Sequence, residues 1–294
     1  MSEVLRERYA TREMVAIFSP ERRYRTWREL WVVLAKSQRE LGLPITEEQI
    51  WGLEEAAPRI DLERVAELER ETRHDVVAHL RHFAEQATAG GGILHLGATS
   101  AYITDNTDVL LQRDALSLLR RRMLALAAEL RELALRTAAL PTLAYTHFQP
   151  AQLTTVGKRA CLWLQDVMED VAAVDERLLR LRCRGVKGTT GTQASFLTLF
   201  DGDHGRVEEL DRSVASALGF ERSWAVTGQT YPRKQDSQVL AALAGIGESC
   251  HKLGTDLRLL QGTGELSEPF GDAQVGSSAM AYKRNPIRAE RMCG

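Results

Sequence analysis

A polar segment near the end of the chain combines residue types that bind and deprotonate an anionic substrate. It runs Gly276-Ser277-Ser278-Ala279-Met280-Ala281-Tyr282-Lys283-Arg284-Asn285-Pro286. The lysine of such a loop stabilises negative charge that develops on a substrate when the loop closes over it. Serine is a poor base at its usual pKa and needs desolvation and neighbouring cations to act as one. The alternative interpretation is an exposed polar loop.

His147 is a second candidate for proton transfer. It lies in Thr146-His147-Phe148-Gln149-Pro150, downstream of Pro141, so the backbone around it is not expected to be helical. Imidazole has the unperturbed pKa nearest neutrality, which suits general acid–base catalysis. A surface histidine without a catalytic role is the alternative.

Two other short segments carry groups that bind anions. Arg73 precedes His74 and Asp75 on a predicted helix, and we interpret the first two as an anion-binding pair, with an ordinary surface position as the alternative. Thr99 and Ser100 offer hydroxyls and backbone N–H groups in a Gly-Ala-Thr-Ser turn, which grip carboxylates or phosphates but are also common in loops.

The histidines do not predict a metal site. His74 and His79 are five positions apart, about 140° around a helix, so they share no face. His79 and His82 share one but lack a third ligand. The glycine-rich run 185–191 does not match the spacing of a nucleotide-triphosphate loop either. We therefore expect neither a metal nor an organic cofactor.

The elements that must position these residues are helices, because helical periodicity is found almost everywhere and strand signals are scarce. Residues 20–41 and 61–88 predict helices of the first third. Three longer runs, at about 108–140, 152–183 and 234–260, each predict a helix of about 40–50 Å. Helices of that length are typical of bundles.

We predict an all-α protein with an N-terminal helical domain, residues 1–98, and a central long-helix bundle domain, residues 99–294. The broad Ala/Leu-rich stripes of the long helices are better explained as bundle core than as a cofactor site, and their breadth indicates a second face against other subunits. The polar segments between these helices are where function concentrates on a rigid scaffold, although ordinary helix connections are the alternative.

Composition excludes several classes of protein. The 294 residues are 44% hydrophobic and 27% charged, with a net charge of -2, so the chain has no overall field for nucleic acid. The charged N-terminus is no secretory signal, and no apolar run is long enough to span a membrane. The four scattered cysteines predict reduced thiols in a cytoplasmic protein.

Residues 276–286 resemble the signature G-S-S-x-M-P-x-K-x-N-P of the fumarase/aspartase superfamily of β-elimination lyases. Residues 73–79, 185–196 and 227–231 resemble its adenylosuccinate lyase branch, and the likeness runs from Arg8 to Arg291. Two departures stand out. Ala281 replaces the usual proline, and the chain stops at Gly294, where members of the superfamily continue into a third helical domain. We therefore expect a fragment without the C-terminal domain.

The resemblance implies a carbon–nitrogen lyase of purine biosynthesis. Its substrates would be adenylosuccinate, which yields AMP, and the succinyl-carboxamide intermediate SAICAR, which yields AICAR; both release fumarate. Ser277 would be the base, His147 the general acid, and Lys283 and Asn285 would hold the charge on the carboxylate. The implied substrate-binding residues are Arg8, Tyr9, Arg73, His74, Asp75, Thr99, Ser100, Gln229, Asn285 and Arg291. No cofactor is implied.

The resemblance also implies a homotetramer in which each active site is built from three subunits. Two alternatives remain open. One is another lyase of the superfamily, such as an argininosuccinate lyase, and the other is a non-catalytic helical scaffold.

Overall fold

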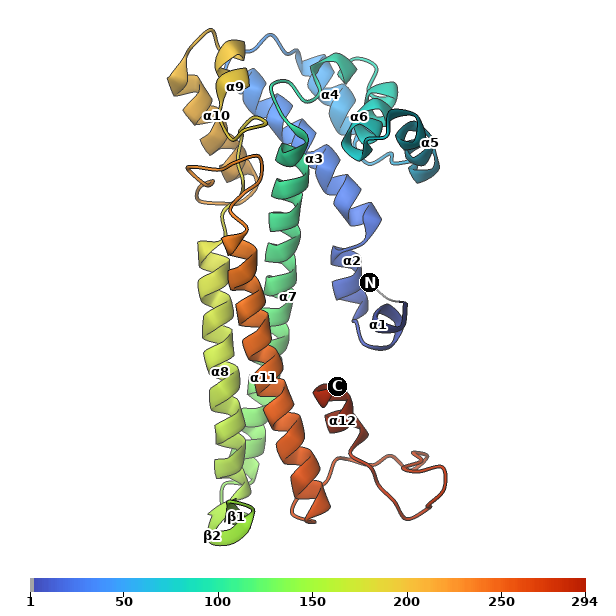
Figure 1. Ribbon diagram of the computed structural model, residues 1–294, viewed down its shortest axis with the longest axis vertical. Helices are drawn as coiled ribbons and strands as arrows, with labels where there is room; N and C mark the ends of the chain where they lie inside the picture. The colour runs from blue at the N-terminus through green and yellow to red at the C-terminus, as the bar shows by residue number, and fades with distance from the viewer. Residues whose placement is uncertain (1–2) are drawn as a thin grey trace. The chain divides into compact units, whose positions relative to one another are not determined.

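A computed structural model describes residues 3–294, and the described chain is mostly helical (Figure 1). This confirms the predicted all-α class built around long helices. The elements in chain order are α1 (Glu3–Arg8), α2 (Arg12–Ile17), α3 (Pro20–Glu40), α4 (Glu47–Ala56), α5 (Leu62–Thr72), α6 (Asp75–Gln86), the 3-10 helix η1 (Gly91–Ile93), α7 (Ser100–Arg136), β1 (Pro141–Thr146), β2 (Gln149–Thr155), α8 (Val156–Arg180), α9 (Ala194–Leu199), α10 (His204–Ala217), α11 (Lys234–Gly262) and α12 (Ile287–Cys293).

Packing divides the described residues into two compact units. The first contains the residues up to Leu118 and Arg180–Gln235, and the second contains Leu119–Leu179 and Asp236–Gly294. These units follow packing within the chain. The sequence domains 1–98 and 99–294 stay a prediction.

Local capping explains where the helices of the first unit begin. Ser19 accepts a hydrogen bond from Arg22 N at 3.2 Å, with proline at the first helical position of α3. Thr46 and Gln49 form a reciprocal capping box at the start of α4. The single helical stretch predicted over residues 61–88 is wrong: Arg73 adopts a left-handed φ of 52° and ends α5, so α6 is a separate helix.

The core of the first unit includes a cluster of rings between α3 and α6. The His79 ring lies 4.0 Å from the Tyr24 ring and 4.9 Å from the Trp27 ring, measured between centroids. His79 and Trp27 are almost completely buried. These contacts fix α6 against α3, and with it the His74 end of α6.

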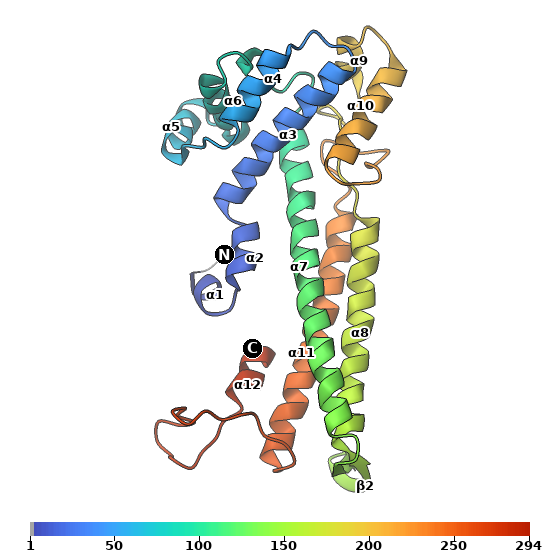
Figure 2. The ribbon, with the colours of Figure 1, turned by 180° about the vertical axis from the view of Figure 1, so that it is seen from behind.

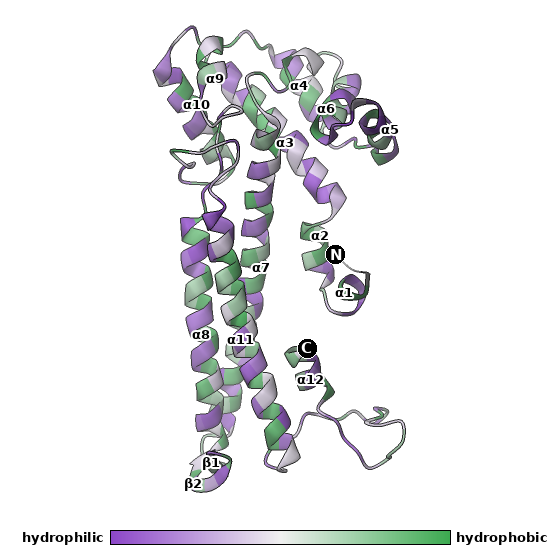
Figure 3. Cartoon of the chain, viewed as in Figure 1, coloured by the Kyte–Doolittle hydropathy of each residue, from purple (hydrophilic) through white to green (hydrophobic). Residues whose placement is uncertain are grey.

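The second unit is a bundle in which α8, α11 and the part of α7 from Leu119 onward lie side by side (Figures 1 and 2). Apolar and polar residues are interspersed along these helices (Figure 3), as is usual for amphipathic helices. The buried cluster consists of Ala127, Leu130, Ala134, Ala160, Trp163, Val167, Leu253 and Leu260. Within the described chain, no helix combines the length and apolarity needed to cross a membrane.

The β-hairpin of the second unit corrects the sequence analysis, which found no strands. β1 and β2 pair antiparallel, with Thr146 opposite Gln149. The two turn residues, His147 and Phe148, have φ of 51° and 56°. Turns of this kind usually contain Asn-Gly or Gly-Gly, so the sequence lacks the ordinary hairpin signal. The hairpin also delays α8, which begins at Val156 and not near residue 152.

Candidate active site

Residues 276–286 form a non-helical loop between α11 and α12 that turns back on itself. Ser277 Oγ accepts hydrogen bonds from the backbone N–H groups two and three residues further along, at 3.3 and 3.2 Å. The Lys283 carbonyl oxygen lies so close to Gly276 that an added Cβ would overlap it. The local backbone therefore brings the stretches around Ser277 and Lys283 together.

The two N–H groups place positive partial charge beside the Ser277 oxygen. Two N–H donors directed at one hydroxyl oxygen stabilise negative charge on that oxygen more than they stabilise the neutral group. The hollow beside the loop has a volume of about 400 Å³, and Ser277 and Ser278 line it. The loop thus offers a serine oxygen, backbone donors and space for a small substrate group.

His147 occupies the exposed tip of the hairpin. Arg159 of α8 holds the hairpin in place, because its guanidinium donates to Leu143 O at 2.8 Å and to Thr142 Oγ1 at 3.3 Å. Thr142 Oγ1 also donates to Glu265, just beyond α11. The hairpin is therefore anchored to both neighbouring helices, while its tip projects the imidazole outward.

The hollow beside the hairpin that carries His147 and the hollow at Ser277 have different lining residues. The hollow beside the hairpin has a volume of about 300 Å³ and is lined by Tyr145 and Phe148 with residues of α8 and α11. The hollow at Ser277 is lined by residues between 270 and 284. Neither of these two hollows is lined by both Ser277 and His147.

In the first unit, Thr99 and Ser100 lie at the start of α7. The turn before them is packed tightly, since Gly97 has a φ of 72° and its Cβ position lies 2.9 Å from side-chain atoms of Phe196 and Leu199. Ser195 Oγ donates to Gly97 O at 2.6 Å. The 185–196 segment, which the sequence singled out for its glycine-rich run and its family resemblance, thus helps to fix the turn that carries the two hydroxyls.

Gln229 lies in a loop of the first unit. Two buried charged residues, Arg184 and Asp105, bind this loop. Arg184 Nε donates to Gln229 O at 2.7 Å. Asp105 accepts from Tyr231 N at 2.7 Å and from Arg233 Nη2 at 3.0 Å. Burial raises the pKa of Asp105, and the hydrogen bonds from Tyr231 N and Arg233 oppose this shift.

No functional role was predicted from the sequence for Arg184 or Asp105. Arg184 is fully buried, and besides Gln229 O it donates to the carbonyls of Lys187 and Gly188. An arginine next to a glycine-rich run was the available signal, because closely spaced backbone carbonyls are natural partners for a guanidinium.

The Arg73-His74-Asp75 segment lies in the first unit, where α5 meets α6, and all three residues are exposed. His74 is the N-cap of α6, and its Nδ1 lies 3.4 Å from Val77 N and 3.4 Å from Asp75 Oδ1. A helix N-terminus beside an arginine suits an anion, and the anion-binding role of Arg73 and His74 stays a prediction.

The remaining predicted residues are spread over both units. Arg8 ends α1 and Tyr9 follows it in the first unit. Asn285 ends the loop of Ser277, and Arg291 lies on α12, both in the second unit. Their roles stay predictions.

His79 and His82 have structural partners in place of a metal. His79 stacks in the ring cluster, and His82 Nε2 accepts a hydrogen bond from Asp61 N at 3.0 Å. No group of three or more His, Cys, Asp or Glu side chains suited to a metal ion occurs among residues 3–294.

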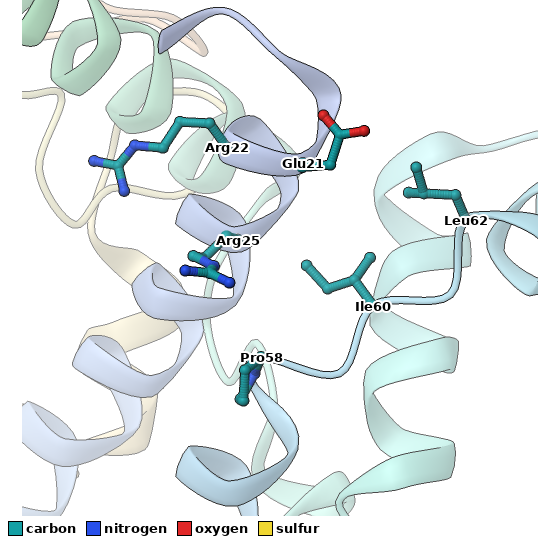
Figure 4. Close-up of a pocket in the computed structure, with 6 residues that line it drawn as sticks. All are labelled: Glu21, Arg22, Arg25, Pro58, Ile60 and Leu62. Carbon is teal, nitrogen blue, oxygen red and sulfur yellow. The ribbon is translucent and has the colours of Figure 1, made fainter. Parts of the chain in front are cut away.

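A further hollow of about 390 Å³ lies in the first unit at the start of α3 (Figure 4). Its lining residues are Glu21, Arg22, Arg25, Pro58, Ile60 and Leu62. None of the predicted site residues lines it. Of its two arginines, Arg22 is engaged with Asp114 at 3.1 Å.

Comparison with known proteins agrees with the motifs. A family profile described as lyase matches residues 6–294. The chain belongs to this lyase family. Curated relatives named adenylosuccinate lyase include those of Schizosaccharomyces pombe, 50% identical over 99% of this chain, and Saccharomyces cerevisiae, 48% identical over 98%. The lyase chain spans 61% of the length of each of these two relatives.

Solved structures of other proteins share the fold. A fumarate lyase from Mesorhizobium sp. BNC1 matches with a TM-score of 0.80 at 26% identity, over 97% of this chain and 62% of its own. A 3-carboxy-cis,cis-muconate lactonizing enzyme from Pseudomonas putida matches with a TM-score of 0.84 at 24% identity, over 100% of this chain and 65% of its own. The second likeness concerns the fold alone.

Proposed function

We propose that this lyase removes fumarate from adenylosuccinate to give AMP, and from SAICAR to give AICAR. The observation that carries the proposal is the loop 276–286, which holds Ser277 between two backbone N–H donors and folds back at Lys283. The names of the yeast relatives, at about half identity over nearly the whole chain, support this substrate class over argininosuccinate.

In the proposed reaction, Ser277 Oγ takes a proton from the carbon next to a carboxylate of the succinyl group. The negative charge then spreads onto that carboxylate, where Lys283 and Asn285 stabilise it. The C–N bond breaks as fumarate forms, and His147 gives a proton to the departing nitrogen. The proton from carbon stays on Ser277 until it passes to solvent, so the enzyme is restored after His147 is reprotonated.

The other predicted residues bind the substrate in this proposal. Thr99 and Ser100 contact the succinyl part. The nucleotide part is held by Arg8, Tyr9, Arg73, His74, Asp75, Gln229 and Arg291. The exposed Arg73–His74 end of α6 and the fixed loop of Gln229 support these roles, because both present polar groups on rigid supports.

We further propose a homotetramer in which each site takes residues from three subunits. The hollow at Ser277 and the hollow beside the hairpin of His147 have different lining residues, which supports a site completed by a second copy. Apolar side chains left exposed on the bundle support the same proposal, among them Leu162 and Leu179 on α8 and Leu240 on α11.

A cytoplasmic location is proposed from the cysteines. All four are unpaired, and Cys183 is buried where oxidation to a disulfide has no partner. Reduced thiols of this kind are usual in reducing compartments.

An assay of fumarate release tests the proposed function. The native protein is offered adenylosuccinate, SAICAR and argininosuccinate in separate reactions. Turnover of the first two is expected. Release of fumarate from argininosuccinate alone would make it a different lyase, and release from none of the three would favour a non-catalytic scaffold.

A further inference from the structure

The loop that carries Ser277 and Lys283 leaves and returns to the bundle at one side chain, Gln261. Gln261 lies at the C-terminal end of α11. Its Oε1 accepts a hydrogen bond from Glu268 N at 2.9 Å, and its Nε2 donates to Arg284 O at 2.7 Å. The side-chain amide of Gln261 therefore connects the segment that enters the loop with the segment that leaves it.

Glu268 makes a second tie at the same place. Helix α12 starts after Pro286, which provides no side-chain cap. The Glu268 carboxylate accepts from Arg288 N at 3.1 Å and from Ala289 N at 2.6 Å, so it satisfies N–H groups that the helix itself leaves unpaired. A carboxylate at a helix N-terminus is also favoured by the helix dipole.

The two ties enclose residues 269–283, which we call the Ser277 loop. The Arg284 guanidinium also lies 5.2 Å from the centre of the Phe270 ring, which brings the two ends together a third time. Inside the loop, the contact of Gly276 with the Lys283 carbonyl fixes the internal turn. The base and the interior are thus held by separate contacts.

We infer that Gln261 and Glu268 are positioning residues that fix the base of the Ser277 loop and so determine where Ser277 and Lys283 are presented to substrate. The inference rests on the proposed function, because it gives these two residues a reaction to serve. Small displacements of reacting groups cost large factors in rate, so loosening the base should slow proton abstraction.

The test uses Gln261→Leu, which removes both hydrogen bonds, and Glu268→Ala, which removes the cap. Glu268→Gln is the conservative variant, since it keeps one of the two oxygen acceptors that Arg288 N and Ala289 N use. Glu208→Gln is the matched control, because Glu208 is exposed on α10. Each substitution is made in the native protein. Amide hydrogen exchange is then measured over residues 269–289 and over α8, and kcat and KM are measured with adenylosuccinate.

We expect Gln261→Leu and Glu268→Ala to speed exchange over residues 269–289 by about fivefold or more, the effect of losing a hydrogen bond, while α8 exchanges as in the control. We expect kcat to fall by about ten- to a hundredfold with KM within about twofold. Glu268→Gln should recover part of the activity that Glu268→Ala loses, because it retains one of the two acceptors. General unfolding would also speed amide exchange in α8, so this comparison distinguishes a loss of positioning from a loss of overall stability.

Unchanged exchange over residues 269–289, or a kcat for both variants equal to that of Glu208→Gln, would overturn the inference. Faster loop exchange with faster exchange in α8 would also overturn it, since the residues would then stabilise the whole bundle. A wild-type protein that releases no fumarate would contradict the proposed function separately, because the exchange measurement does not depend on turnover.

Discussion

His147 stands at the tip of a turn in which two adjacent non-glycine residues adopt positive φ. Residues other than glycine adopt positive φ at some energetic cost, which contacts with the surrounding structure must offset. Arg159 and Thr142 supply that support from the base of the hairpin. The sequence could indicate His147 as a candidate for proton transfer. It could not indicate the positive φ values of the turn, because neither His147 nor Phe148 is an ordinary turn residue.

Replacement of His147 tests its role as general acid. We expect His147→Ala to lower kcat for adenylosuccinate by about 10²–10⁴-fold, the usual contribution of such a group. His204→Ala is the matched control, since His204 is an exposed histidine at the start of α10. Steady-state kinetics of both variants decide, and a kcat for His147→Ala equal to that of the control would remove His147 from this role.

The alanine at position 281 offers a test of loop ordering. Ala281→Pro should restrict the free loop and favour its ordered form by about 0.4–1 kcal/mol, which corresponds to a kcat about twofold to fivefold higher or a KM about twofold to fivefold lower. Ala279→Pro is the contrast, because Ala279 N donates to Ser277 Oγ and proline removes that donor. We expect this second variant to lose activity. Identical kinetics for Ala281→Pro and wild type would make the departure at 281 silent.

At the scale of elements, the bundle depends on close contacts between helices. Gly157 lies at one such close contact, where the start of α8 meets the C-terminal end of α7. A Cβ at Gly157 would overlap the Ala134 carbonyl oxygen and approach Ala138 Cα to 2.7 Å. The hairpin that carries His147 connects these same two helix ends, so their spacing also sets its base.

Gly157→Ala should therefore destabilise the protein by about 1–3 kcal/mol, the usual cost of overpacking. Gly52→Ala on α4 is the matched control, because its Cβ would meet only ordinary contacts, with Ala89 Cβ at 3.5 Å the nearest. That change should be neutral or slightly stabilising. Thermal unfolding measures both, and equal melting temperatures would show that the helices separate without cost.

The packing of α6 on α3 predicts a dependence of stability on pH. Burial lowers the pKa of His79 to about 4, and the nearby Arg28 and His82 cations add to the shift. In the unfolded chain this imidazole takes up a proton near pH 6.5, whereas the folded protein resists it down to about pH 4. Stability should therefore fall by up to about 3 kcal/mol between those two pH values.

His79→Phe keeps a ring against Tyr24 but cannot be protonated. Urea unfolding at several pH values between 7.5 and 4 should show a shallower loss of stability for this variant than for wild type. His204→Ala, at an exposed position, should follow wild type. A slope for His79→Phe equal to that of wild type would contradict the assigned pKa.

The sequence was informative wherever one signal decided the structure. Ser19-Pro20 and the Thr46–Gln49 capping box start α3 and α4 as local chemistry requires. Long periodic runs predicted α7, α8 and α11. The break at Arg73 was missed because no glycine or proline marks it. Contacts between distant segments, such as Arg184 with Gln229 and Gln261 with Arg284, depend on packing that spacing alone does not determine.

At the scale of the whole molecule, we propose that the acid and the base of one site come from different chains. One copy holds the serine loop and the histidine hairpin at separate hollows, and the chain spans 61% of the length of its yeast relatives. The proposed tetramer accounts for the separation and for the exposed apolar residues of the bundle. Native mass spectrometry should accordingly detect four copies, and a monomer would contradict the shared site.

Mixing two inactive variants tests the shared site most directly. His147→Ala and Ser277→Ala proteins are each prepared, then unfolded and refolded together, and fumarate release from adenylosuccinate is measured against each variant refolded alone. If the acid and the base come from different chains, some sites of the mixed oligomers contain both native residues, and activity returns. Mixed oligomers that form but stay as inactive as the separate variants would contradict the account.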